Sequence, residues 1–417
     1  MKKWGIFLTF LLMFSLILPG AQAINNTSKE NRQNFKTGLE RLLENDMSVL
    51  EGKKVGLITN PTGIDRNLNS IVDVLYNHPN IELKALYGPE HGVRGSAQAG
   101  QYVEFYTDPA TGLPVYSLYG ATKKPTPEML EGIDVLVFDI QDVGTRFYTY
   151  IYTMAYAMEA AKENNIPFVV LDRPNPLGGE QVEGPVLDPT YSSFIGLYPI
   201  PLKHGMTVGE MAHLFNEEFG IGADLKVVEM KGWKRSWAYE DSGLEWVLPS
   251  PNMPTKDTAL VYPGSALIEG TNVSEGRGTT KPFELIGAPF INGDQLAKKL
   301  NEEALPGVKF RSASFIPASS KHVGKLSHGI EIHVTDDKLF QPVLTGITLV
   351  KAIHDLYPND FQFRAEDSRG ISFFDLLVGN GWIREYIESG RSVDDIVSRY
   401  NEELNTFKDL REEYLLY

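Results

Sequence analysis

The chain has 417 residues, of which 42% are apolar and 22% are charged, and its formal net charge is −15. This composition excludes a disordered, collagen-like or coiled-coil protein, and the length predicts two domains rather than one hydrophobic core. The acidic balance, without a long run of Lys or Arg, argues against a nucleic-acid partner, and the absence of cysteine excludes disulfides, thiolate nucleophiles and cysteine-ligated metals.

Residues 1–23 have the pattern of a secretory signal peptide. Lys2 and Lys3 form a basic start, residues 4–18 are apolar, and Ala-Gln-Ala at 21–23 is a small-x-small cleavage site. An apolar run of about 15 residues is short for a membrane span, although a retained N-terminal anchor is the alternative. We therefore predict a protein that is secreted into the cell-wall space, with no membrane partner after signal cleavage.

Residues 24–36 are polar and predict a flexible leader, after which short apolar runs alternate with helical periods. Runs that are apolar throughout and separated by helices indicate a parallel sheet that is covered on both faces. We therefore predict a Rossmann-like domain over residues 37–262. Its expected strands are 54–59, 82–87, 114–118, 134–140 and 167–171, and its expected helices begin near residue 39, cover 71–75 and run from 145 to 164.

The rhythm changes from about Tyr262, where helices and strands follow in mixed order. This order predicts a smaller α+β domain over residues 263–417. The expected helices are 294–300, 344–356 and 392–407, and the expected strands are 308–315 and 329–334.

Polar side chains follow four of the predicted parallel strands. Ligands of an open parallel sheet bind outside the carboxyl ends of its strands, so these residues are candidates for a site. The alternative for each loop is turn chemistry and solvated charge. The candidates are Asn60 after the first strand, Glu90, His91 and Arg94 after the second, Asp139, Asp142 and Arg146 at the end of the 134–140 strand, and Arg173 and Asn175 after 167–171.

Known cofactor motifs are missing from the sequence. Neither G-x-G-x-x-G nor a Walker motif occurs, so nucleotide binding is weakly supported, and there is no G-x-S-x-G elbow or H-E-x-x-H pair. We therefore expect no cofactor and no metal. His91 is expected to donate a hydrogen bond to a ligand rather than to coordinate a metal, because no spaced ligand partners accompany it.

Aromatic and glycine-rich segments add further candidates. Trp233 and Trp237 lie in the charged, loop-like segment 231–246, where indoles could stack on sugar faces; packing between the domains is the alternative. Two polar loops follow, and the second combines three glycines with charged residues, which favours a functional loop facing the first domain. The candidates in these loops are Asn252, Asn272, Glu275 and Arg277.

Seven motifs resemble those of the exo-β-N-acetylmuramidase family of glycoside hydrolases, and the resemblance covers about residues 37–417. It implies removal of a terminal N-acetylmuramic acid from the non-reducing end of peptide-free peptidoglycan chains. It also implies a Rossmann-like domain and an auxiliary domain with the active-site cleft between them. The motifs are GLITNPTG (56–63), GPEHGVRG (88–95), FDIQDVGTR (138–146), DRPNP (172–176), SPNMP (250–254), EGTNVSEGRGT (269–279) and LLY (415–417).

For the reaction, Glu90 is the best candidate for the general acid. It stands at a strand end among glycines, and partial burial would favour the protonated carboxyl; helix capping or pairing with Arg94 is the alternative. A second group must stabilise the oxocarbenium-like centre. We rank Glu275 first for it, then Asp142, then Asp139; alternatively the substrate's 2-acetamido oxygen attacks, and Asp142 or Asn272 orients it.

Muramic acid carries a lactyl carboxylate, and the planar guanidinium of arginine suits such a group. The candidates in the motif loops are Arg94, Arg146, Arg173 and Arg277. A different function class also fits two α/β-type domains around a cleft, namely an extracytoplasmic sugar-binding protein without catalysis. An indispensable acid would distinguish the enzyme from this alternative.

Overall fold

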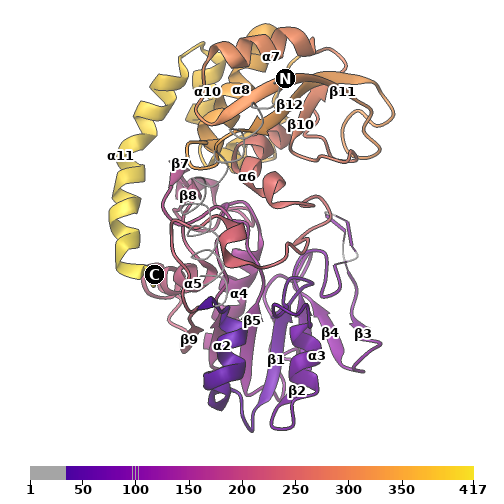
Figure 1. The fold of residues 1–417 in the computed structure, drawn as a ribbon, viewed down its shortest axis with the longest axis vertical. Helices are drawn as coiled ribbons and strands as arrows, with labels where there is room; N and C mark the ends of the chain where they lie inside the picture. The colour runs from indigo at the N-terminus through magenta and orange to yellow at the C-terminus, as the bar shows by residue number, and fades with distance from the viewer. Residues whose placement is uncertain (1–33, 96, 99, 102) are drawn as a thin grey trace, which may run out of the picture.

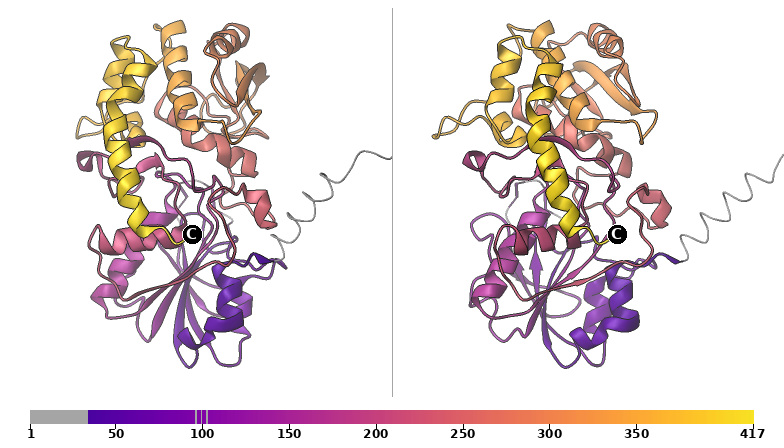
Figure 2. Two further views of the ribbon diagram at one scale, coloured as in Figure 1. Left: turned by 60° about the vertical axis from the view of Figure 1, so that its left-hand side comes forward. Right: turned by 90° about the vertical axis from the view of Figure 1, so that its left-hand side faces the viewer.

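The computed structural model describes residues 34–417 except 96, 99 and 102. The chain forms two lobes, one around a seven-stranded sheet and the other around a three-stranded sheet (Figure 1). The last long helix, α11 (Val393–Arg411), runs along the outside from the second lobe to the first (Figures 1 and 2). The predicted signal peptide and most of the predicted leader lie outside the described residues.

The large sheet confirms the predicted Rossmann-like topology. Its order is β3-β4-β2-β1-β5-β6-β9, and all neighbours are parallel except β3 and β4. Without the edge strand β3, this is the 3-2-1-4-5-6 strand order of the Rossmann fold. Successive strands are added on one side of β1 and then, from β5 on, on its other side. The strands are β1 (Lys54–Thr59), β2 (Glu82–Gly88), β3 (Tyr106–Thr107), β4 (Pro114–Ser117), β5 (Val135–Asp139), β6 (Phe168–Leu171) and β9 (Leu225–Val228).

Helices cover both faces of this sheet because successive strand side chains point to opposite sides. On β5, Leu136 and Phe138 belong to a core with α4 and α5, whereas Val135 and Val137 belong to a core with α2 and α3. The four helices are α2 (Gly38–Arg41), α3 (Ile71–Tyr76), α4 (Tyr150–Glu163) and α5 (Val208–Glu217).

Two features of the first lobe differ from the prediction. Helix α4 begins at Tyr150 rather than at residue 145, because Thr145 bridges to Lys203 and Thr149 takes the N-cap position. The stretch 145–149 is therefore a loop that leads into the helix. Helix α5 and strand β9 were not predicted; β9 is a short edge strand of which only the last residue is buried, so it lacks an apolar run.

The second lobe is the predicted α+β unit. Its antiparallel sheet has the order β10-β12-β11, and β11 has the predicted bounds. The predicted boundary at residue 262 falls inside α6, which packs against α8. The elements are α6 (Lys256–Ser265), β10 (Leu285–Ala288), α7 (Gly293–Glu302), β11 (Val308–Phe315), β12 (Ser327–Val334), α8 (Pro342–Leu356), α9 (Phe373–Val378) and α10 (Trp382–Glu388).

The two lobes share one continuous core, which extends from the α4 and α5 face of the large sheet into the second lobe. A small hairpin, β7 (Glu183–Val186) and β8 (Pro201–Lys203), lies between them and contacts α11. At the end of the chain, the Tyr417 hydroxyl donates to Asp172, which follows β6, at 2.7 Å. Loops of both lobes are therefore held in a fixed relation. No helix in the described part of the chain combines the length and apolarity needed to cross a bilayer.

Candidate active site

A pocket with an empty volume of about 420 Å³ is bounded by both lobes. Residues after β2 and β5 form one part of the wall, and residues of the second lobe form the other. The lining residues are Glu90, His91, Phe147, Tyr148, Thr149, Tyr150, Ser250, Asn252, Met253, Tyr262, Arg277 and Phe283.

Glu90 supplies the one carboxyl group in this wall among the residues that the structure describes. Its Oε1 accepts from the backbone N–H of Gly100 at 3.0 Å, and its Oε2 accepts from the hydroxyl of Thr149 at 3.3 Å. Burial and the neighbouring Glu90 raise the pKa of Tyr119 to about 12, so the Tyr119 hydroxyl stays protonated and donates to Glu90. Glu90 is therefore a half-buried, oriented carboxyl that faces a pocket.

His91 lies next to Glu90 in the same wall, with its backbone in the left-handed region at φ 74°. Its Nδ1 is 2.8 Å from the carbonyl oxygen of Ala97. Burial lowers the pKa of His91, so the neutral imidazole is favoured. The loop turns sharply at this point: a Cβ on Gly88 would lie 2.8 Å from the backbone nitrogen of Val93, so a larger residue would clash.

Arg277 brings a cation into the wall from the second lobe. Its Nε donates to Glu269 Oε1 at 2.9 Å and lies 3.4 Å from Glu275 Oε1. The guanidinium lies over the ring of Phe283, 4.9 Å from the centroid. Nη1 has no hydrogen-bond partner in the described structure, so one end of the guanidinium is available to a ligand.

Glu275, the first-ranked second carboxylate, lies behind Arg277 and is absent from the pocket wall. Only 1% of its side chain is exposed, and its Oε2 is 2.9 Å from the Lys321 ammonium group. Lys321 also donates to three backbone carbonyls of the same loop, which fixes the loop that carries Arg277. The carbonyls belong to Ile268, Thr271 and Val273. The structure thus gives Glu275 a position that supports Arg277.

Three tyrosines in the wall were not singled out from the sequence. The ring of Tyr148 meets Tyr150 and Tyr262 edge to face, with centroids 4.9 Å and 5.8 Å apart. Burial raises the pKa of Tyr148 and Tyr262 well above 10, so their hydroxyls stay neutral. In the sequence these rings look like core residues. The one usable signal was the place of Tyr148 and Tyr150 shortly after a polar strand end, and Tyr262, inside α6, had none. Asn252, a predicted binding residue, lines the same pocket.

Asp142 is buried and lies outside the pocket wall. Its Oδ2 accepts from the backbone N–H of Gly144 at 2.6 Å and is 3.6 Å from His204 Nε2. The backbone N–H of Met206 donates to Nδ1 of His204, so the ring hydrogen is on Nε2 and points toward the carboxylate. Asp142 and His204 therefore form a buried pair, and sequence analysis had not singled out His204.

The other three arginines predicted to recognise a substrate carboxylate have protein partners. Arg94 bonds to Asp108 at 2.9 Å, and Arg173 bonds to Asp139 at 2.8 Å, so both arginines and Asp139 serve internal ion pairs. Arg146 is fully buried. Its guanidinium donates to backbone carbonyls from both lobes: Pro185 at 2.9 Å, Ile200 at 3.0 Å and Leu377 at 2.8 Å.

Three predicted asparagines hold backbone instead of facing the pocket. The Oδ1 of Asn60 accepts from the Thr62 backbone at 2.9 Å, and Nδ2 of Asn175 donates to the Met206 carbonyl at 2.9 Å. Asn272 donates to the carbonyl of Asp360 at 2.8 Å, which ties the glycine-rich loop to a neighbouring segment. These side chains shape the loops, and none lines the pocket.

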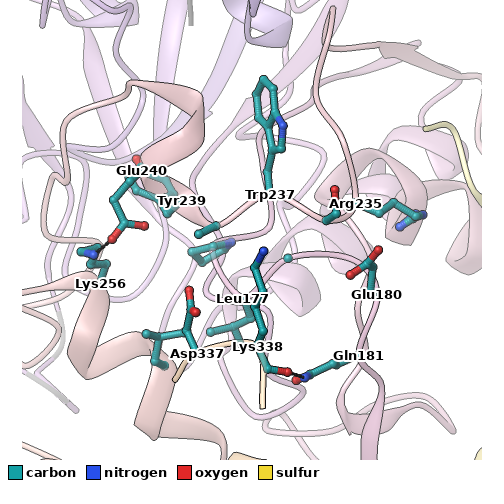
Figure 3. A pocket seen from close by; sticks show the side chains of 15 residues that line it. Leu177, Glu180, Gln181, Arg235, Trp237, Tyr239, Glu240, Lys256, Asp337 and Lys338 are labelled. Atoms are coloured by element: carbon teal, nitrogen blue, oxygen red, sulfur yellow. Dashed lines mark hydrogen bonds and ion pairs between the residues drawn. The ribbon is translucent and has the colours of Figure 1, made fainter. Parts of the chain in front are cut away.

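The tryptophans lie in a small separate core. Trp233 and Trp237 are 5% and 7% exposed and pack with Phe35 and Met230, which favours packing over sugar stacking. Trp237 also borders a second pocket of about 610 Å³, where its ring extends away from Leu177 (Figure 3). In that pocket Gln181 donates to the carbonyl of Lys338, and Glu240 is paired with Lys256 (Figure 3).

The sequence matches two family models that together cover most of the chain. The model described as the N-terminal part of exo-β-N-acetylmuramidase NamZ matches residues 55–257, and the model of its C-terminal part matches residues 260–417. The chain belongs to the exo-β-N-acetylmuramidase family. A protein of Bacillus subtilis (strain 168) named peptidoglycan β-N-acetylmuramidase NamZ is 59% identical over 414 residues, which are 99% of this chain and 98% of that protein. The chain is therefore a glycoside hydrolase.

Two solved structures of Bacteroides fragilis NCTC 9343 proteins, both described as DUF1343 family proteins, share the fold. One superposes with a TM-score of 0.85 at 43% identity, and the other with a TM-score of 0.73 at 33% identity. Each comparison covers 92% of this chain and 99% of the solved one. The two-lobed architecture is thus that of the exo-β-N-acetylmuramidase family, and the assignment to an enzyme family argues against the sugar-binding protein without catalysis.

The described residues contain no cluster of His, Cys, Asp or Glu that could hold a metal ion. The side chains of the pocket wall that can take part in chemistry are the carboxyl of Glu90, the imidazole of His91, the guanidinium of Arg277 and the neutral tyrosine hydroxyls. Such a set can exchange a proton, bind an anion and hydrogen-bond a sugar.

Proposed function

We propose that this enzyme releases a terminal N-acetylmuramic acid from the non-reducing end of peptide-free peptidoglycan chains during cell-wall turnover. The observation that carries the proposal is that Glu90 of the first lobe and Arg277 of the second line the same pocket. A glycosidase needs a proton donor at the leaving oxygen, and the muramic residue adds an anionic lactyl group. One carboxyl and one cation in a single pocket meet both requirements.

Glu90 is proposed to act at the glycosidic oxygen. It transfers its proton to that oxygen while the bond to the anomeric carbon breaks, so the remaining glycan leaves as an alcohol. Glu275, Asp142 and Asp139 lie outside the described pocket wall. This arrangement favours the 2-acetamido oxygen as the group that bonds to the anomeric carbon. Water then attacks the anomeric carbon, and the bond between this carbon and the acetamido oxygen breaks. The Glu90 carboxylate takes up a proton from the attacking water.

Arg277 is proposed to bind the lactyl carboxylate at C3 of the terminal sugar. Its Nη1 has no partner among the described residues, whereas Nε and Nη2 are held by Glu269. Glu275 and Lys321 hold the loop from behind. A guanidinium fixed in this way loses little freedom on binding, which strengthens recognition of a planar carboxylate.

The proposal also places the enzyme outside the cytoplasmic membrane, where its polymeric substrate lies. The support is the signal-like sequence of residues 1–23, with its Ala-Gln-Ala motif. N-terminal sequencing of protein recovered from the culture medium should find a chain that begins at Ile24. Recovery of the uncleaved chain from the membrane fraction would instead indicate a retained anchor.

The activity is tested with purified peptide-free glycan strands of two kinds, one ending in muramic acid and the other in N-acetylglucosamine at the non-reducing end. Mass spectrometry should detect free N-acetylmuramic acid from the first kind and no product from the second at early times. Release of internal fragments, or equal attack on both kinds of strand, would contradict the exo-acting muramidase. Heat-inactivated enzyme serves as the blank.

A further inference from the structure

Among the residues that the structure describes, none is a partner for one nitrogen of the His91 ring. The carbonyl oxygen of Ala97, 2.8 Å from Nδ1, can only accept, so Nδ1 carries the ring hydrogen. In the neutral ring Nε2 is then the acceptor nitrogen. No group in the described part of the chain donates to Nε2, while the residue lines the pocket. His91 therefore offers the pocket an acceptor, whereas the sequence predicted a donor.

Burial keeps the His91 ring neutral. It lowers the pKa of His91 more than the neighbouring Glu90 and the hydrogen bond to Ala97 raise it, and Arg277 adds a smaller effect that also lowers it. The other titratable groups of the wall are the hydroxyls of Tyr148, Tyr150 and Tyr262, and burial keeps them uncharged at neutral pH by raising their pKa values. Nε2 thus remains an acceptor under the conditions in which the enzyme is expected to work.

The backbone fixes the direction of this acceptor. His91 has φ 74°, a conformation that is uncommon for residues other than glycine but better tolerated by His, Asn and Asp. Gly92 follows with φ 76°, so the chain turns within two residues. The turn and the Ala97 contact together hold the imidazole in the wall next to Glu90.

We infer that His91 Nε2 accepts a hydrogen bond from the acetamido N–H at C2 of the terminal sugar. The inference rests on the proposed function, which places Glu90 at the oxygen on C1 and Arg277 at the substituent on C3. His91 interacts electrostatically with both of these residues, and C2 lies between C1 and C3. The N–H is the hydrogen-bond donor that C2 carries. His91 is then the residue that selects N-acetylated sugars.

The test uses two 4-nitrophenyl β-muramosides that differ in one atom group. One carries the 2-acetamido group, and the other carries a 2-O-acetyl ester, which keeps the carbonyl but lacks the N–H. The ratio of their kcat/KM values is measured for the wild type and for His91→Gly, since glycine adopts the required φ without strain. Intrinsic differences between the substrates cancel between the two enzymes. We expect the ratio to fall at least about tenfold in the variant, as for a lost buried hydrogen bond.

A second measurement needs no variant. In the wild type the same ratio should be constant at neutral pH and fall at pH values below about 6.5, because protonated His91 presents a hydrogen at Nε2 toward the substrate N–H. Any effect of pH on departure of the leaving group is common to both substrates, because both carry 4-nitrophenol, and it cancels in the ratio. This series decides the inference even where His91→Gly does not fold.

The control is His213→Ala, since His213 lies on α5 outside the pocket and pairs with Glu217. Its ratio should equal that of the wild type. An unchanged ratio in folded His91→Gly, or a wild-type ratio that does not vary with pH, would overturn the inference while leaving the muramidase intact. Failure of the wild type to hydrolyse the acetamido substrate would instead overturn the proposed function, and the inference with it.

Discussion

Arg146 is expected to stabilise the fold, and Arg146→Met tests this directly. The substitution leaves three buried carbonyls, two at the β7–β8 hairpin and one at Leu377 of the second lobe, without their donor. Each unpaired carbonyl costs about 1–3 kcal/mol. Burial also lowers the pKa of Arg146 to about 10 from 12.5. At about 1.4 kcal/mol per pKa unit, burying this charge destabilises the folded state by about 3 kcal/mol, and the variant no longer has this cost. The net loss is about 3 kcal/mol.

The assay is urea unfolding at pH 7, followed by circular dichroism, together with kcat/KM of the folded variant. We expect a lower urea midpoint with a similar slope and kcat/KM within about threefold of the wild type, because the side chain is buried away from the pocket wall. Unchanged stability combined with a lost preference for muramic over glucosamine substrates would refute this reasoning. That result would return Arg146 to the substrate-binding role that the sequence predicted.

Arg277→Met should lower the preference for muramic over glucosamine glycosides by ten- to a hundredfold, because a charge-assisted hydrogen bond to a carboxylate contributes about 1.5–3 kcal/mol; equal kcat/KM ratios would contradict it. Glu275→Gln should raise KM for the muramic substrate more than it lowers kcat, because the substitution loosens the loop that carries Arg277. A loss of kcat alone, together with rescue of Glu275→Ala by azide, would instead identify Glu275 as a nucleophile. Burial and repulsion from Glu210 raise the pKa of Asp172 to about 7 from an ordinary value near 4. The protonated acid therefore stabilises the fold fully below about pH 4, and this contribution is lost as the pH rises through 7. Between pH 5 and pH 8, the urea midpoint of the wild type should therefore fall more than the urea midpoint of Asp172→Asn.

The sequence predicted the centre of the fold well because the parallel strands are buried on both faces. Strands β1, β5 and β6 are short runs of mostly apolar residues, and runs of this length are more typical of buried strands than of helices. Edge elements such as β9 carry no such run, since only its last residue is buried. The start of α4 was misplaced by five residues because the loop before it contains Phe147 and Tyr148, which resemble the aromatic residues at the start of the helix.

The sequence predicted part of the wall of the candidate pocket, and the predicted residues that lie elsewhere have a common cause. Glu90, His91 and Arg277 were predicted because their loops follow strand ends or combine glycines with charge, and all three line the pocket, while their roles stay predictions. Arg94 and Arg173 have the same local signals, but their partners lie elsewhere in the fold. Local sequence cannot show which charge meets which, and it cannot separate a tyrosine in a pocket wall from one in the core.

The role of Glu90 as the acid is the central claim, and leaving-group dependence tests it most directly. The 2,4-dinitrophenolate of a 2,4-dinitrophenyl muramoside leaves without protonation, whereas the sugar that leaves from a natural disaccharide must be protonated at the glycosidic oxygen. We predict that Glu90→Gln lowers kcat/KM at least about a hundredfold for the disaccharide and less than about tenfold for the dinitrophenyl substrate. Glu131→Gln, an exposed site, should change neither. Equal losses on both substrates, or full activity of Glu90→Gln on the disaccharide, would contradict the account.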